Sequence, residues 1–70
     1  MLKEQVEKTF LLTVETENAE YETDIFAKDL DEAYNNIQLE LRCEALTIKD
    51  ENSFVIIPKN KIDSVLVIEK

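Results

Sequence analysis

Five carboxylates lie within ten consecutive residues, and no other side chains of this 70-residue chain are better placed to act together. They are Glu15, Glu17, Glu20, Glu22 and Asp24, and residues 9–27 hold no lysine or arginine among them. A run of like charges usually serves only to keep a surface solvated. It can also attract a basic partner and speed the encounter with it. The sequence therefore leaves two interpretations open, a solubilising face and a docking face for a basic protein surface.

The residue types in this chain do not favour metal binding or catalysis. The five acids lack the Asp-x-Asp-x-Asp-Gly spacing of specific calcium loops, so we expect no metal site. The chain has no histidine to transfer protons near neutral pH, and no glycine to form a phosphate-binding loop. Its single thiol, Cys43, lacks a histidine to activate it and further cysteines to share a soft metal. We therefore expect no catalytic residues, no cofactor and no enzymatic activity.

The net charge of −8 narrows the range of partners and locations. It opposes direct binding to nucleic acid and to anionic membranes, because both rely on lysine and arginine. No stretch approaches the roughly 20 apolar residues of a membrane span. Residues 1–8 lack the hydrophobic region of a signal peptide, and one unpaired cysteine fits a reducing compartment. We expect a cytoplasmic protein that contacts neither nucleic acid nor membrane.

Two alternating segments, residues 9–16 and 20–27, predict a β-hairpin that carries the acids. Phe10, Leu12 and Val14 fall on one face, with Leu11, Thr13 and Glu15 on the other, and the second segment follows the same period. A turn at Asn18-Ala19, where asparagine tolerates the left-handed conformation, sets the expected register. The cross-strand pairs expected in this register are Leu12 with Ile25, Val14 with Thr23, Leu11 with Phe26, Glu15 with Glu22 and Glu17 with Glu20.

The remaining chain predicts one helix and three further strands. Asp29 and Glu32 form a capping-box pattern that opens the helix. Its expected core-facing stripe, spaced as i, i+3, i+4, contains Leu30, Ala33, Tyr34, Ile37 and Leu41. Strands are expected over residues 46–49, 53–57 and 62–69. The prediction is one α+β domain over residues 1–70, ordered β-β-α-β-β-β, with a mainly antiparallel sheet, one helix packed on one face and a flexible N-terminal segment 1–8.

Two of these strands are apolar on both faces, yet one helix covers only one face of a sheet. The strands are Phe54–Ile57 and Val65–Ile68. One alternative is that one hairpin folds over the other as a second layer. The other is an apolar patch that is covered by a second chain, most simply in a two-fold homodimer. The residues expected in that interface are Leu11, Phe26, Phe54, Ile56, Leu66 and Ile68, with Leu39 on the back of the helix.

Resemblances do not assign the chain to a family. Residues 54–65 are similar to the terminal strand pair of Sm-like RNA-binding barrels, but they lack that family's glycine-containing turn, and the helix here is internal. In size and acidity the chain is similar to many short proteins of bacteriophages and other mobile elements. We expect a small, acidic, non-enzymatic protein-interaction module that forms a homodimer and binds a basic protein surface as a modulator or inhibitor. The alternative is a structural, self-assembling subunit whose acids only keep it soluble.

Overall fold

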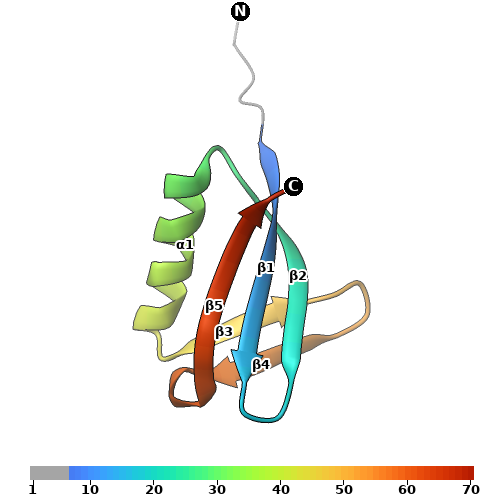
Figure 1. The fold of residues 1–70 in the computed structure, drawn as a ribbon, viewed down its shortest axis with the longest axis vertical. Coiled ribbons are helices and arrows are strands. Elements are labelled where there is room, and N and C mark those ends of the chain that lie inside the picture. Colours follow the sequence, from blue (N-terminus) through green and yellow to red (C-terminus); the bar gives the residue numbers. More distant parts are fainter. Residues whose placement is uncertain (1–6) are drawn as a thin grey trace, which may run out of the picture.

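Three antiparallel strands form the larger layer of the fold (Figure 1). In this sheet β1 (Lys8–Thr16) lies between β2 (Glu20–Ala27) and β5 (Ile62–Glu69). The computed structural model describes residues 7–70. Alternation along β1 turns Phe10, Leu12 and Val14 to one face, and all three are buried. We call this the inner face of the sheet and the opposite side its outer face.

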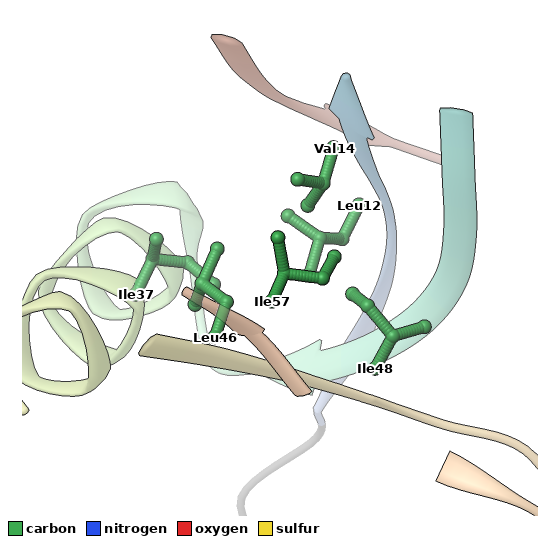
Figure 2. Packing of buried hydrophobic residues seen from close by; sticks show 6 residues of the cluster. All are labelled: Leu12, Val14, Ile37, Leu46, Ile48 and Ile57. Atoms are coloured by element: carbon green, nitrogen blue, oxygen red, sulfur yellow. The ribbon is translucent and has the colours of Figure 1, made fainter. Parts of the chain in front are cut away.

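A helix and a separate β-hairpin form the second layer and cover the inner face. They are α1 (Leu30–Arg42) and the pair β3 (Ala45–Lys49) and β4 (Phe54–Pro58), and the 3-10 turn Lys59–Lys61 then leads into β5. Figure 1 shows the hairpin crossing one end of the large sheet and α1 lying beside β5. The side chains of the main core cluster point toward one another between the layers (Figure 2). They are Leu12, Val14, Ile37, Leu46, Ile48 and Ile57.

The predicted fold class is confirmed, and the six elements follow one another in the predicted order. The strands do not share one sheet, however, because β3 and β4 pair only with each other. Of the two alternatives for a second layer, the structure therefore has the hairpin folded over the sheet beside the helix. Most of the predicted flexible segment 1–8 falls outside the described residues. Its last residue, Lys8, begins β1 and pairs with Ala27.

The predicted register of the first hairpin is wrong by two residues. Val14 pairs with Tyr21 and not with Thr23. The tip of the turn is therefore at residues 17–18 and not at the expected Asn18-Ala19. The Thr16 N–H donates to the Ala19 carbonyl over 2.8 Å, and the Ala19 N–H donates to the Thr16 hydroxyl over 3.1 Å. This arrangement closes the turn without a positive φ. Among residues 7–70 only Glu44 has one, at 70°.

The helix begins where the capping pattern predicted. The Asp29 carboxylate accepts a hydrogen bond from the Glu32 N–H over 2.8 Å, and Glu32 in turn accepts one from the Lys28 N–H over 2.7 Å. The expected core stripe is wider than the buried one, because only Ala33 and Ile37 are buried. Leu30 and Tyr34 are more than half exposed, since they face the open side of α1 beside β5.

Candidate interaction surfaces

The outer face of the large sheet joins the predicted acidic residues to part of the predicted apolar surface. Antiparallel pairing aligns β2, β1 and β5 in rows, and alternation places each row on one face. One row contains Asp24, Leu11 and Ile68. The next rows are Glu22, Thr13 and Leu66, then Glu20, Glu15 and Ser64. The outer face is therefore acidic along β2 and apolar along β5, and the two stripes meet at β1.

The acidic stripe contains one directly opposed pair of like charges, Glu15 and Glu20. The predicted pairs of Glu15 with Glu22 and of Glu17 with Glu20 are wrong, because the register differs. The Glu15 carboxylate accepts a hydrogen bond from the Ser64 hydroxyl over 2.8 Å, and Asp24 forms an exposed ion pair with Lys70 at 3.0 Å. Within residues 7–70 the carboxylates of Glu17, Glu20 and Glu22 accept no hydrogen bond, so they remain available to a basic group.

The β3–β4 turn adds two carboxylates that the sequence did not connect with this site. Asp50 and Glu51 line an open cleft of about 790 Å³, across from the acids of β2. The Thr23 hydroxyl donates to the Lys49 carbonyl over 2.9 Å, which ties this turn to β2. The only sequence signal for the pair was two acids in a turn, about 26 residues away from β2. Only the folding of the hairpin over the sheet brings the two groups together.

The apolar stripe of the outer face follows β5. Leu66 is 54% exposed and Ile68 is 49% exposed, with half-buried Leu11 beside them on β1. Phe26, also exposed, lies on the same face at the end of β2. Burying one such side chain completely contributes about 1.5–3 kcal/mol. The outer face therefore presents apolar and acidic groups to the same ligand.

The other predicted interface residues lie elsewhere. Phe54 and Ile56 are exposed on the side of β4 that is turned away from the core, so they are separated from the outer face by both layers. Leu39 is exposed on α1. The predicted interface is thus divided among three surfaces and does not form one patch.

A further apolar surface was not predicted. A groove of about 270 Å³ separates α1 from β5, with Leu30, Tyr34 and Leu41 on the helix side and Val65 and Val67 on the strand side. The helical periodicity assigned the three helix residues to the core. In the structure they form one wall of an open groove, because α1 packs more closely on β3 than on β5.

The geometry defines a small two-layer α+β domain whose acidic side chains lie on an exposed sheet face and along an open cleft beside it. Among residues 7–70 no three potential ligands of a metal ion converge, and none of the helices there has the length and apolar character to cross a membrane. Comparison of the chain with models of known families, with curated proteins and with solved structures finds no match.

Proposed function

We propose that the protein is a non-enzymatic interaction module that binds a basic, partly apolar surface of another protein. The outer face of the large sheet is the proposed binding surface, with Glu15, Glu20, Glu22 and Asp24 as its acidic part. Glu17 adds a carboxylate at the adjoining turn. The observation that carries the proposal is that this acidic stripe and the apolar stripe of β5 lie on the same face, with only β1 between them.

Repulsion within the free protein and complementarity to the partner both favour binding at this face. Like charges on directly opposed residues destabilise a sheet, at an exposed site by a few tenths of a kcal/mol up to about 1 kcal/mol. A lysine or arginine placed between Glu15 and Glu20 removes that cost. Acid-lined surfaces also speed the approach of basic partners. The apolar side chains of β5 then supply burial, which charge alone does not give.

The residue inventory and the thiol support the rest of the proposal. Without histidine and with one cysteine, the chain is poorly equipped for proton transfer or nucleophilic catalysis. The free Cys43 thiol is exposed, which suits a reducing compartment, and we propose a cytoplasmic location. A module that covers a basic face of another protein, such as one that contacts nucleic acid, would act as a modulator or inhibitor of that protein.

A defined ligand tests the proposal. A synthetic peptide that alternates lysine with valine is titrated into the protein and followed by NMR, with a matched glutamate–valine peptide as control. We expect the lysine peptide alone to shift the backbone resonances of Leu11, Glu22 and Leu66. Reversing Glu15 and Glu22 to lysine should abolish the shifts. Reversing Asp31 and Asp63 to lysine, an equal change of four charge units on exposed residues outside the acidic stripe, should preserve them. Binding that persists in the double variant at physiological salt would contradict the proposal.

A second candidate function is a structural, self-assembling subunit whose acids serve solubility only. The exposed apolar residues outside the acidic face, such as Phe54 and Ile56, favour it. Light scattering over a dilution series separates the two. An interaction module forms at most a small closed oligomer, whereas a structural subunit grows in mass as its concentration rises.

A further inference from the structure

The hydrogen bonds at both ends of the β3–β4 ladder fix which backbone groups face outward. The Asp50 N–H donates to the Ser53 carbonyl over 2.8 Å, and the Lys59 N–H donates to the Glu44 carbonyl over 2.9 Å. Hydrogen-bonded pairs alternate along an antiparallel ladder. The odd-numbered residues of β4 therefore bond to β3, and the even-numbered ones direct their N–H and C=O groups away from it.

The outward groups of β4 belong to Phe54 and Ile56, and within residues 7–70 they have no partner. Pro58, the next even-numbered residue, has no N–H and ends this free edge. Phe54 is 62% exposed and Ile56 is 58% exposed, and Val55 between them is partly exposed. A free, apolar strand edge is a template for pairing with another chain.

The opposite edge of the hairpin is protected. On β3 the outward N–H of Thr47 donates to the Glu40 carboxylate over 3.2 Å, and the outward carbonyl of Lys49 accepts from the Thr23 hydroxyl over 2.9 Å. Side chains of α1 and β2 thus occupy two positions where a further strand would bind. The contrast within one hairpin indicates that the β4 edge, and not the β3 edge, is available.

The two edges of the large sheet are less suited to pairing with a second copy. Glu20, Glu22 and Asp24 all lie on edge strand β2, so two copies placed edge to edge there would bring like charges together. The β5 edge carries Asp63 near one end and Glu69 at the other, and α1 lies beside it (Figure 1). Antiparallel pairing of two β5 strands would again oppose acids.

The β4 strand differs from both because opposite charges flank it. Asp50 and Glu51 precede it, whereas Lys59 and Lys61 follow it. In an antiparallel pair of β4 strands, the acidic end of one copy lies beside the basic end of the other. Although the chain has a net charge of −8, the opposite charges at the two ends of β4 attract a second copy to this edge.

We propose that two copies of the protein pair through β4, antiparallel about a two-fold axis, to form a four-stranded sheet in the order β3-β4-β4-β3. In the proposed register Phe54 of one copy lies opposite Ile56 of the other, and Val55 lies opposite Val55. Both free N–H groups of each copy then find carbonyl acceptors, and Pro58 stays outside the ladder. This pairing goes beyond the proposed function and does not depend on it, because it uses a different surface of the protein.

Such a dimer leaves both outer faces of the large sheets uncovered. Their residues, such as Leu66, lie on the far side of the core from the β4 edge. One dimer therefore presents two copies of the acidic and apolar surface. A partner with two basic sites would bind it more tightly than it binds a monomer, because the second contact is intramolecular.

Molar mass measured by light scattering across a dilution series tests the pairing, with two matched variants. Ile56→Lys places a charge on the proposed edge, and Leu66→Lys makes the same change on the outer face at similar exposure. We expect wild type and Leu66→Lys to be dimers at high concentration and Ile56→Lys to be a monomer. A dimeric Ile56→Lys, a monomeric Leu66→Lys, a wild type that stays monomeric, or masses that grow beyond the dimer would overturn the proposal.

Cross-linking tests the register. Residues opposed in a non-hydrogen-bonded antiparallel pair have Cα atoms about 4.5 Å apart, within the range that disulfides span. In a Cys43→Ser background, Val55→Cys should form a disulfide-linked dimer under mild oxidation. The Thr47→Cys variant, with its cysteine on β3, should run as a monomer in electrophoresis without reducing agent. Cross-linking of Thr47→Cys at the rate of Val55→Cys would contradict the register.

The two proposals fail independently. Dimerisation is measured without any partner, and the peptide titration is repeated on the monomeric Ile56→Lys variant. If that variant binds the lysine peptide as wild type does, binding at the outer face does not require the dimer. The mass measurement then tests the β4 pairing alone. If wild type dimerises through β4 but ignores the peptide, the pairing stands and the proposed function falls.

Discussion

Glu15 and Glu20 lie directly opposite one another across β1 and β2, next to the turn that joins these strands. Their like charges destabilise the free protein, so Glu20→Gln should raise the free energy of unfolding by about 0.2–0.5 kcal/mol. The gain should shrink in high salt, because the site is exposed and screened. Urea unfolding at low and high salt measures both effects. Asp63→Asn, which removes an unopposed acid, should change the free energy less, and an equal gain there would assign the effect to net charge.

The gain in stability from Glu20→Gln should accompany a loss of binding. The same substitution removes a carboxylate from the proposed docking face, so the lysine–valine peptide should bind more weakly to the variant. A solubilising face would show the gain in stability without a loss of binding. Measuring both properties on one variant therefore separates the two interpretations that the sequence left open.

Glu44 supplies a second prediction, because it holds a left-handed conformation at the end of α1, with φ at 70°. Its N–H donates to the Leu41 carbonyl over 3.0 Å, as residues that end helices commonly do. A non-glycine residue is strained there by roughly 1 kcal/mol or more. Glu44→Gly should therefore stabilise the protein by about 0.5–1 kcal/mol, since relief of strain outweighs the added freedom of the unfolded chain. Asp50→Gly, at a negative φ, should destabilise it in the same thermal unfolding experiment.

Alternation identified the faces of the first hairpin but not its register. A shift of two residues keeps every side chain on its own face, so Phe10, Leu12 and Val14 point inward in either register. The turn decides between the two. A turn at Asn18-Ala19 would need positive φ values, which alanine disfavours. Closure at Thr16 avoids them and adds a hydroxyl hydrogen bond.

The second layer was harder to predict than the hairpin. The sequence marks Leu46 and Ile48 as one apolar side of a strand, but it does not say which surface that side covers. Local patterns describe single elements, whereas the choice between joining the sheet and crossing it depends on packing between distant segments. The core cluster that includes Leu12, Ile37 and Leu46 illustrates this, because these residues come from three elements. The acids of the β3–β4 turn were missed for the same reason.

The uneven burial of α1 gives a third prediction. Ile37 is buried in the main core, whereas Tyr34, one turn earlier, is exposed beside the groove. Ile37→Ala should cost about 2–4 kcal/mol of stability, because it leaves a cavity among packed side chains. Tyr34→Ala should cost less than about 1 kcal/mol. Chemical denaturation of the two variants measures the difference. Equal losses of stability would mean that Tyr34 is buried as well as Ile37, as the expected core-facing stripe from Leu30 to Leu41 predicts.

A charge exchange gives the fourth prediction and tests the attraction between the ends of paired β4 strands. In the proposed dimer Glu51 of each copy lies near Lys59 of the other, so the two-fold axis creates this contact twice. Each exposed pair contributes about 0.2–1 kcal/mol and the dimer contains two, so Glu51→Lys should raise the dimer Kd roughly twofold to thirtyfold. Lys59→Glu should do the same, and the double variant should restore the Kd of wild type. Sedimentation equilibrium at low salt measures all four proteins. If the double variant is weaker than either single variant, the ends do not meet and the strands pair in another register.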